Sequence, residues 1–309
     1  MRLISLILLF LLSGTVSAQK VEWYTTTQTS PWVKQKVKPE RTTTGAEIVL
    51  DPAQRLQLIT GIGGCFNEMG WDALNALSAE DREAVLQAIF GKDGACFDYC
   101  RLPMGANDFA MSFYSSADVA GDFNLVNFNI DRDRYILIPY IKAARQINPD
   151  LRIWASPWCP PPWMKTNNHY ASAVRPSGEK DVNGLLPHEA IAEFSTGFRM
   201  EEGYLKTYAD YFARFIKAYE AEGLPLECIH VQNEPCSNQV FPSCKWRTED
   251  LTFFLGHYLG PTFERENIKT DIYFGTINTS NPDYVRTALR DEQAAKYIKG
   301  VGFQWDGKK

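Results

Sequence analysis

The chain has 309 residues, with 32 basic and 37 acidic side chains and a formal net charge of −5 at pH 7. This acidic balance argues against nucleic acid or an anionic membrane as a partner, since both attract basic patches. Aromatic residues make up 13% of the sequence, which suits a carbohydrate or another flat-faced ligand but is equally consistent with a large apolar core.

Residues 1–18 have the pattern of a secretory signal peptide. Arg2 supplies the positive end, residues 3–12 form the apolar run, and Val16-Ser17-Ala18 is a small-residue cleavage site. The apolar run is too short for a stable membrane span. We therefore expect an exported protein, whether periplasmic, at the cell surface or extracellular, without a membrane span.

The seven cysteines predict disulfide bonding and not metal binding. An exported chain permits disulfides, and Cys236 and Cys244, which flank a short loop, are the pair that we expect. The odd total leaves at least one thiol free or paired elsewhere. No cluster of cysteine and histidine has the spacing of a zinc site, so we expect neither a metal nor another cofactor.

Residues 19–50 are predicted to form exposed β structure. Residues 21–24 and 46–50 are short strand-like runs with a threonine-rich segment between them. Two such strands are too few to form a domain alone. Residues 19–50 are therefore expected to be a β segment, and residues 51–309 the main domain.

From residue 51 onward, strand-like and helix-like runs alternate. The predicted strands are residues 56–62, 99–104, 151–155, 227–234, 270–276 and 300–305. The predicted helices are residues 78–91, 132–147 and 204–222, followed by one that Thr248 caps. This alternation is typical of an α/β fold with a parallel sheet, and of the (β/α)8 TIM barrel in particular. Six strands are found instead of eight, so we expect an incomplete barrel and an N-terminal fragment.

The strand that begins at residue 227 leads to a candidate catalytic carboxylate. Pro235 cannot donate a hydrogen bond to a sheet ladder, so the strand should stop there. Glu234 then lies at the carboxyl end of the strand, where parallel α/β folds carry their chemistry. A glutamate at this position is equally expected to cap a loop or to pair with an arginine, and the local sequence leaves both roles open.

Five short motifs at the strand ends occur in an order that is typical of one family. They are Gly61-Ile62-Gly63-Gly64, Arg101-Leu102-Pro103-Met104, Ala155-Ser156-Pro157-Trp158, Trp163-Met164-Lys165-Thr166-Asn167 and Asn233-Glu234-Pro235. Together they resemble glycoside hydrolase family 30, the family of lysosomal glucosylceramidase and of microbial endo-β-1,6-glucanases. The resemblance extends from about residue 57 to residue 306. It implies a retaining β-glycosidase that acts on a β-glucan or another β-glucoside through two carboxyl groups about 5 Å apart.

The resemblance also implies roles for individual residues. Glu234 would be the acid/base that protonates the leaving oxygen, and the residues that would contact the sugar are Arg101, Asp108, Trp158, Asn233 and Trp305. A structural role is an alternative for several of them, because a strand-end arginine often pairs with a buried carboxylate and tryptophans often fill a barrel. Lys165 is expected to be solvated, and Glu68 to support the site and not to catalyse.

The family's nucleophile is a glutamate at the end of the seventh strand, and no residue of this sequence matches it. We therefore expect the 309-residue chain to be inactive by itself. Residues 19–50 would be the first part of the family's β-sandwich domain. One alternative is a truncated, non-catalytic glycan-binding protein. Another is a barrel glycosidase with Asp108 as second carboxylate, which would be inverting if the separation exceeded about 6.5 Å.

Overall fold

The computed structural model describes residues 21–38, 51, 53–175 and 183–304. The chain divides into two compact units, Met1–Leu58 and Ile59–Lys309. In the first unit, β1 (Trp23–Thr25) pairs with β2 (Val33–Gln35) as a short antiparallel hairpin. The predicted signal peptide and the predicted strand at residues 46–50 lie outside the described residues.

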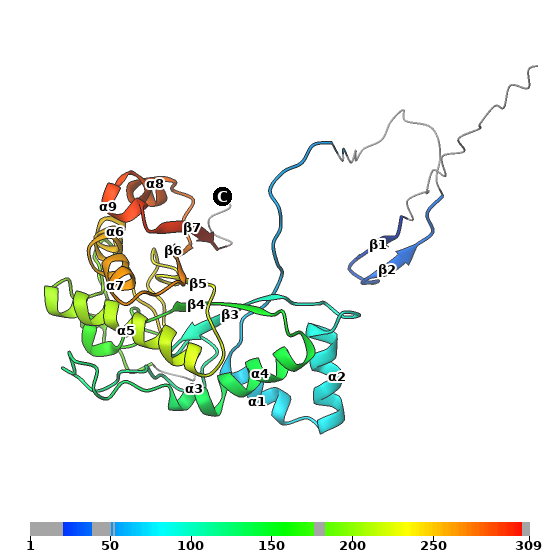
Figure 1. Cartoon of the computed structure of the whole chain (residues 1–309), viewed down its shortest axis with the longest axis horizontal. Coiled ribbons are helices and arrows are strands. Elements are labelled where there is room, and N and C mark those ends of the chain that lie inside the picture. Colours follow the sequence, from blue (N-terminus) through cyan, green and yellow to red (C-terminus); the bar gives the residue numbers. More distant parts are fainter. Residues whose placement is uncertain (1–20, 39–50, 52, 176–182, 305–309) are drawn as a thin grey trace, which may run out of the picture. The chain divides into compact units, whose positions relative to one another are not determined.

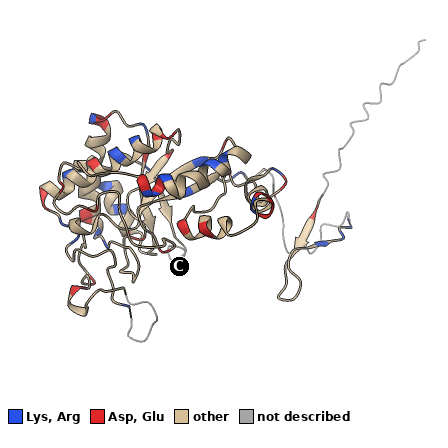
Figure 2. Cartoon of the chain, turned by 90° about the horizontal axis from the view of Figure 1, so that it is seen from below, with Lys and Arg blue, Asp and Glu red and all other residues tan. Residues whose placement is uncertain are grey.

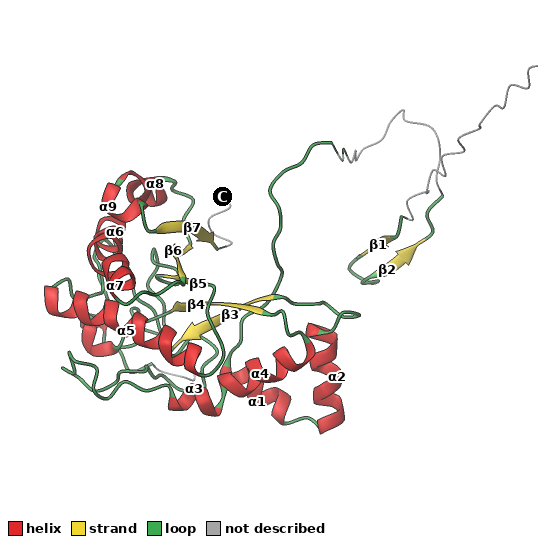
Figure 3. Ribbon diagram, viewed as in Figure 1, coloured by secondary structure: helices red, strands yellow, loops and turns green. Residues whose placement is uncertain are grey.

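A five-stranded parallel sheet forms the centre of the second unit (Figures 1 and 3). Its strands are β3 (Tyr99–Met104), β4 (Arg152–Pro157), β5 (Cys228–His230), β6 (Asp271–Ile277) and β7 (Ile298–Phe303). Strands that follow one another in the chain are neighbours in the sheet, and every pair is parallel. This is the order expected for the wall of a TIM barrel and confirms the predicted α/β class.

The predicted first strand, residues 56–62, is wrong, because most of this segment is exposed and irregular. Only its end runs beside β3, where the carbonyl oxygen of Ile62 accepts from the N–H group of Tyr99. A single parallel bridge then joins Cys65 to Arg101. The intervening glycines weaken a regular strand, and a Cβ added at Gly63 would collide with the carbonyl oxygen of Tyr99.

Helices connect the strands and lie on one side of the sheet (Figure 3). The α-helices are α1 (Glu68–Asn75), α2 (Ala79–Phe90), α3 (Asp131–Tyr135), α4 (Leu137–Ile147), α5 (Glu202–Ala221), α6 (Thr248–Phe254), α7 (Gly260–Arg265), α8 (Asp283–Arg290) and α9 (Glu292–Ala295). Shorter turns are the 3₁₀ segments η1 (Pro162–Met164) and η2 (Pro187–Glu189) and the π-helical segment η3 (Leu255–Leu259).

The predicted helix at residues 78–91 is confirmed as α2, and Ser78 caps it by accepting the N–H group of Asp81. Helix α5 confirms the predicted helix at residues 204–222.

Two helix predictions need correction. The predicted helix at residues 132–147 is divided into α3 and α4, with Ile136 at φ −118° and ψ −65° between them. Pro139 accounts for the break, since proline has no N–H group and its ring clashes with the carbonyl group four residues earlier. Thr248 is not a cap. It is the first residue of α6, and its hydroxyl donates to the carbonyl oxygen of Tyr284 at 2.6 Å.

The predicted disulfide between Cys236 and Cys244 is also wrong, since all seven cysteines are free thiols. The two side chains face different surroundings. Burial raises the pKa of the Cys236 thiol to about 12, against the opposing effects of Lys245 and of a contact with Tyr284. Burial also raises the pKa of the Cys244 thiol, which lies deeper, within the field of the Lys165 ammonium.

The main apolar core lies between the sheet and the helices, and α5 contributes much of it through Tyr208, Phe212 and Phe215. On the inner side of the sheet, a cavity of about 610 Å³ is lined by alternating strand residues that include Tyr99 and Trp154. Lysines and arginines lie among aspartates and glutamates along the helices (Figure 2). Within the described ranges, no helix is long and apolar enough to cross a membrane.

Candidate active site

Asn233 is the centre of a hydrogen-bond cluster at the carboxyl end of the sheet. It follows β5, it is buried, and its N–H group donates to the carbonyl oxygen of Pro157 at the end of β4. Its Oδ1 atom accepts from Nη2 of Arg101 at 2.7 Å, from the hydroxyl of Thr276 at 3.1 Å and from Nε2 of Gln304 at 3.1 Å. Residues on or directly after strands β3, β5, β6 and β7 therefore meet at the Oδ1 atom of Asn233. Because Oδ1 takes three donors, the amide is oriented with Nδ2 away from them.

Arg101 projects from β3 into this cluster and is held by neutral groups. Its Nε and Nη2 atoms donate to the hydroxyl oxygen of Ser156 at 3.0 and 2.6 Å. The guanidinium stacks 3.9 Å from the centre of the Trp158 ring and 4.9 Å from that of Trp154. Burial lowers the pKa of Arg101 to about 10, so the side chain stays charged at neutral pH. Its bonds within the described residues go to Ser156 and Asn233, so no buried carboxylate pairs with it.

The other residues that were predicted to contact the sugar differ in their burial and in their contacts with this cluster. Trp158 follows β4 and is only 6% exposed, because Arg101 covers its ring. Asp108 lies in the loop after β3, where its side chain is exposed and its charge raises the pKa of Arg101. Trp305 lies outside the described residues. The structure therefore brings Arg101, Trp158 and Asn233 into direct contact, with Asp108 at the edge of the group.

Glu234 has a backbone conformation that is uncommon for its residue type. Its φ angle is +45°, in the left-handed region that costs a residue with a Cβ atom about 1–2 kcal/mol. The N–H group of Glu234 donates to the carbonyl oxygen of Thr276 at 3.1 Å, which ties the turn to β6. The side chain is half-buried, and its Oε2 atom accepts from Nε2 of Gln239 at 3.1 Å. Residues in this backbone region are often found at functional sites, because the fold must hold them there.

Lys165 was expected to be solvated, and this is wrong. The side chain is fully buried, and its ammonium group donates to four oxygen atoms: the carbonyl oxygens of Tyr170, Ala171 and Ser243 and the hydroxyl of Ser172. The bond to Ser243 is 2.7 Å long and crosses from the loop after β4 to the loop after β5. Lys165 therefore holds together the two loops beside Glu234.

Glu68 is structural in this arrangement. It is buried at the start of α1 and forms a two-pronged ion pair with Arg132, at 2.6 and 2.7 Å. It also accepts the N–H group of Met111 at 2.8 Å. These bonds fix the loop after β3, which carries Asp108.

His230 ends β5 but has the features of a structural residue. Its Nδ1 atom lies 2.8 Å from the carbonyl oxygen of Gly275, and its ring packs on those of Trp154 and Tyr273. Burial lowers its pKa to about 4, so the ring is neutral at physiological pH. In the described part of the chain, no group of three or more histidine, cysteine or acidic residues is arranged to hold a metal ion.

Four residues of the site received no role from the sequence: Ser156, Thr276, Gln304 and Gln239. Ser156 lies in the motif Ala155-Ser156-Pro157-Trp158, Thr276 ends the predicted strand 270–276, and Gln304 lies in the predicted strand 300–305. Their places in the fold therefore follow from the sequence. Gln239 lies in a loop with no regular pattern, and no sequence signal indicated its contact with Glu234.

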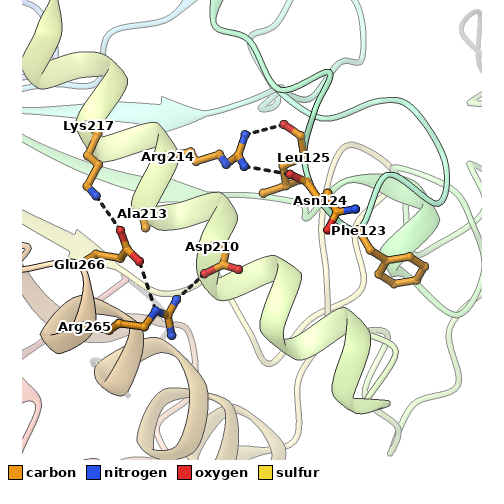
Figure 4. A pocket seen from close by; sticks show the side chains of 9 residues that line it. All are labelled: Phe123, Asn124, Leu125, Asp210, Ala213, Arg214, Lys217, Arg265 and Glu266. Atoms are coloured by element: carbon orange, nitrogen blue, oxygen red, sulfur yellow. Dashed lines mark hydrogen bonds and ion pairs between the residues drawn. The ribbon is translucent and has the colours of Figure 1, made fainter.

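A second pocket, of about 310 Å³, lies between α5, α7 and residues 123–125 (Figure 4). Its charged side chains satisfy one another. Lys217 pairs with Glu266 at 2.8 Å, and Arg265 pairs with Asp210 at 2.7 Å. Arg214 donates to the carbonyl oxygens of the loop. Since these charges are already paired, the pocket is a poor candidate for ligand binding.

Comparison with known proteins identifies relatives of this arrangement. Residues 59–308 match the model of the Glycosyl hydrolase family 30 TIM-barrel domain. The chain is 27% identical to the lysosomal acid glucosylceramidase of Mus musculus, over 87% of this chain and 50% of the mouse protein. It is also 27% identical to the endo-1,6-β-D-glucanase of Neurospora crassa, over 82% of this chain and 48% of the fungal protein. The solved structure of the endo-β1,6-glucanase BT3312 matches with a TM-score of 0.70 at 26% identity, over 91% of this chain and 59% of that chain. The chain thus spans about half the length of the curated relatives it matches.

Proposed function

Because this chain belongs to glycosyl hydrolase family 30, we propose that it is part of an exported retaining β-glycosidase that cleaves a β-glucan or another β-glucoside. In this proposal Glu234 is the acid/base. It protonates the leaving glycosidic oxygen, and later removes a proton from the water that releases the sugar from a second carboxylate. The names of the mouse and fungal relatives, a glucosylceramidase and a β-1,6-glucanase, support this substrate class.

The observation that carries the proposal is the orientation of Asn233 beside Glu234. The Oδ1 atom of Asn233 is occupied by Arg101, Thr276 and Gln304, so Nδ2 is the polar atom left to meet a ligand. A hydrogen-bond donor next to the acid/base suits the sugar 2-hydroxyl, a contact that strengthens in the transition state of glycoside cleavage. The buried guanidinium of Arg101 fixes that orientation.

The remaining contact residues have narrower proposed roles. Arg101 and Asp108 contribute polar contacts to the sugar, and Trp158 supports Arg101 through ring stacking. Trp305 is proposed as an apolar wall on which the sugar ring packs, on the family resemblance alone. We further propose that the nucleophile lies outside these 309 residues, since the chain spans only about half of its relatives. The isolated chain would then bind sugar without turnover.

Activity measurements test this proposal. The purified chain is expected to release no product from an aryl β-glucoside, whereas a longer product of the same gene that supplies a seventh strand ending in glutamate is expected to be active. Replacement of Glu234→Gln in the longer product should abolish turnover. Activity of the 309-residue chain that Glu234→Gln removes would contradict the absence of a nucleophile. Activity removed by Asp108→Asn would instead identify Asp108 as the second carboxylate.

A non-catalytic glycan-binding protein is a second candidate. The cluster of Arg101, Trp158 and Asn233 is complete within the described residues and needs no second carboxylate to bind a sugar. Isothermal titration with β-glucan oligosaccharides tests it. Binding that Asn233→Ala weakens is expected, and absence of heat at millimolar ligand would exclude this function for the chain.

A further inference from the structure

The side-chain amide of Gln239 contacts both Glu234 and the loop that follows it. Its Nε2 atom donates to Oε2 of Glu234 at 3.1 Å and to the hydroxyl oxygen of Ser237 at 2.9 Å. An ionised carboxylate only accepts hydrogen bonds, so the nitrogen of the amide, and not its oxygen, must face Glu234. Both N–H groups of this amide are thereby used.

A chain of hydrogen bonds also joins this loop to the end of β6. The backbone N–H group of Cys236 can only donate, and it donates to Oδ1 of Asn278 at 3.0 Å. The nitrogen of the Asn278 amide therefore faces the other way, and donates to the hydroxyl of Ser237 at 2.9 Å. Ser237 therefore accepts two N–H groups, one from Asn278 and one from Gln239.

The backbone of Gln239 is also anchored. Its carbonyl oxygen accepts the N–H groups of Ser172 and Ala173 at 3.0 and 2.9 Å, and its own N–H group donates to the hydroxyl of Ser243 at 3.2 Å. Ser172 and Ala173 belong to the loop after β4. Gln239 is therefore held between the loops of two strands, while Asn278 joins it to a third.

We propose that Gln239 is a positioning residue for Glu234, which fixes the carboxylate and favours its ionised form. A hydrogen bond donated to a carboxylate stabilises the charged state over the protonated state. The inference rests on the proposed role of Glu234 as acid/base. If Glu234 has that role, Gln239 favours the step in which the Glu234 carboxylate acts as a base. For the step in which Glu234 acts as an acid, Gln239 holds its carboxyl group in place.

The other ionisable groups near this corner are unchanged by substitution of Gln239. Among the residues that the structure describes, they include Arg101 on β3, Asp108 in the loop after it, and Cys236, Lys245 and Tyr284, which surround the loop after β5. A change in the titration of Glu234 in a Gln239 variant therefore reports the loss of the amide and not the loss of another charge.

The test is a ¹³C NMR titration of the 309-residue chain with labelled glutamate carboxyl carbons, in which the Glu234 signal is assigned from Glu234→Gln. In Gln239→Met, which keeps the length but removes both N–H groups, the pKa of Glu234 should rise by about one unit relative to the unsubstituted chain. In Gln239→Glu, which places a second carboxylate there, it should rise further. Asn238→Ala is the matched control, since Asn238 holds the same loop through Ile191 but has no bond to Glu234, and it should leave the titration unchanged.

Ser237→Ala provides an independent variant if Gln239→Met does not fold. It removes the oxygen that orients the Gln239 amide, and should raise the pKa of Glu234 by a smaller amount. Unchanged titration of Glu234 in folded Gln239→Met and Gln239→Glu would overturn the inference, as would equal shifts in the Asn238→Ala control. The titration needs no substrate. Loss of the proposed glycosidase function would therefore leave a positive result for Gln239 intact, and the two failures are distinguishable.

Discussion

The guanidinium of Arg101 lies 3.9 Å from the centre of the Trp158 ring, so two residues from neighbouring strands cover one another at the mouth of the sheet. The resemblance to known glycosidases implied that each would contact the sugar separately. In the structure the two side chains stack on each other, and the Arg101 guanidinium also donates a hydrogen bond to Asn233. The shape of this cluster therefore depends on the planarity of the Arg101 guanidinium as much as on its charge.

Arg101→Lys tests the importance of this planar group. Lysine keeps the positive charge but cannot bond Ser156 and Asn233 together or stack on Trp158 in the same way. We expect the free energy of unfolding to fall by about 1–3 kcal/mol, because buried polar partners are left unsatisfied. Urea denaturation at pH 7 measures this change. Arg286→Lys, at an exposed position on α8, is the control, with an effect within about 0.5 kcal/mol. Equal effects would show that charge alone matters at residue 101.

Lys165→Met should strongly destabilise the protein. Methionine retains the apolar stem but leaves four buried oxygen atoms without their shared donor. A loss of about 3 kcal/mol in the free energy of unfolding is expected. Lys206→Met is the matched control, since that ammonium is exposed and pairs with Glu202 on the same helix. A Lys165→Met variant as stable as the control would mean that the loops hold together without the ammonium.

Asp133 should make the protein less stable as the pH rises. This carboxyl group is fully buried and accepts the hydroxyls of Tyr114 and Tyr219, and burial raises its pKa to about 6. The native state therefore binds the proton more tightly than the unfolded state, in which the pKa is about 3.9. Its stabilising contribution is complete below pH 4 and is lost between about pH 4 and pH 6. The free energy of unfolding, measured in urea across this window, should fall by up to about 3 kcal/mol more than in Asp133→Asn. Parallel pH profiles would contradict the assignment.

His230 should make the protein less stable as the pH falls, which is the opposite of the effect of Asp133. Its pKa of about 4 lies below that of an unfolded histidine, about 6.5, so the unfolded state binds the proton more tightly. Its contribution to stability is present above pH 6.5 and is lost as the pH falls towards 4. His230→Asn keeps an N–H group for the carbonyl oxygen of Gly275 but does not titrate. The variant should therefore gain relative stability, by up to about 3 kcal/mol, between pH 6.5 and pH 4. A constant difference between the two proteins would show that His230 has the same pKa in the native and unfolded states.

The regular elements of the fold were largely predictable from local sequence. Strand β3 spans the predicted residues 99–104, and α2 lies between Ser78 and Gly91, which are ordinary helix boundary residues. The segment at residues 56–62 was not predictable, because apolar residues alone do not show whether a neighbouring strand is available for pairing. Pro139 did signal the break between α3 and α4, and the regular apolar pattern around it obscured that signal.

The candidate site was predictable only for residues that strand ends position directly. Asn233 and Glu234 follow a short apolar strand before a proline, and that pattern specifies a place in the fold. The burial of Lys165 could not be predicted in this way, because the carbonyl groups that receive its ammonium come from residues 170, 171 and 243, in two loops. Whether a long charged side chain is buried depends on partners that no local pattern reveals.

The buried ammonium of Lys165 also provides a chemical probe of the loops that surround Glu234. Reagents that methylate or acylate lysine react with amines that reach solvent, so Lys165 can react only when the loops after β4 and β5 separate. Its rate of modification, compared with that of exposed lysines in the same sample, would measure how often the site opens. A sugar that bridges the two loops should slow this reaction. Mass spectrometry of the single peptide that contains Lys165 would then follow ligand binding without any measurement of catalysis.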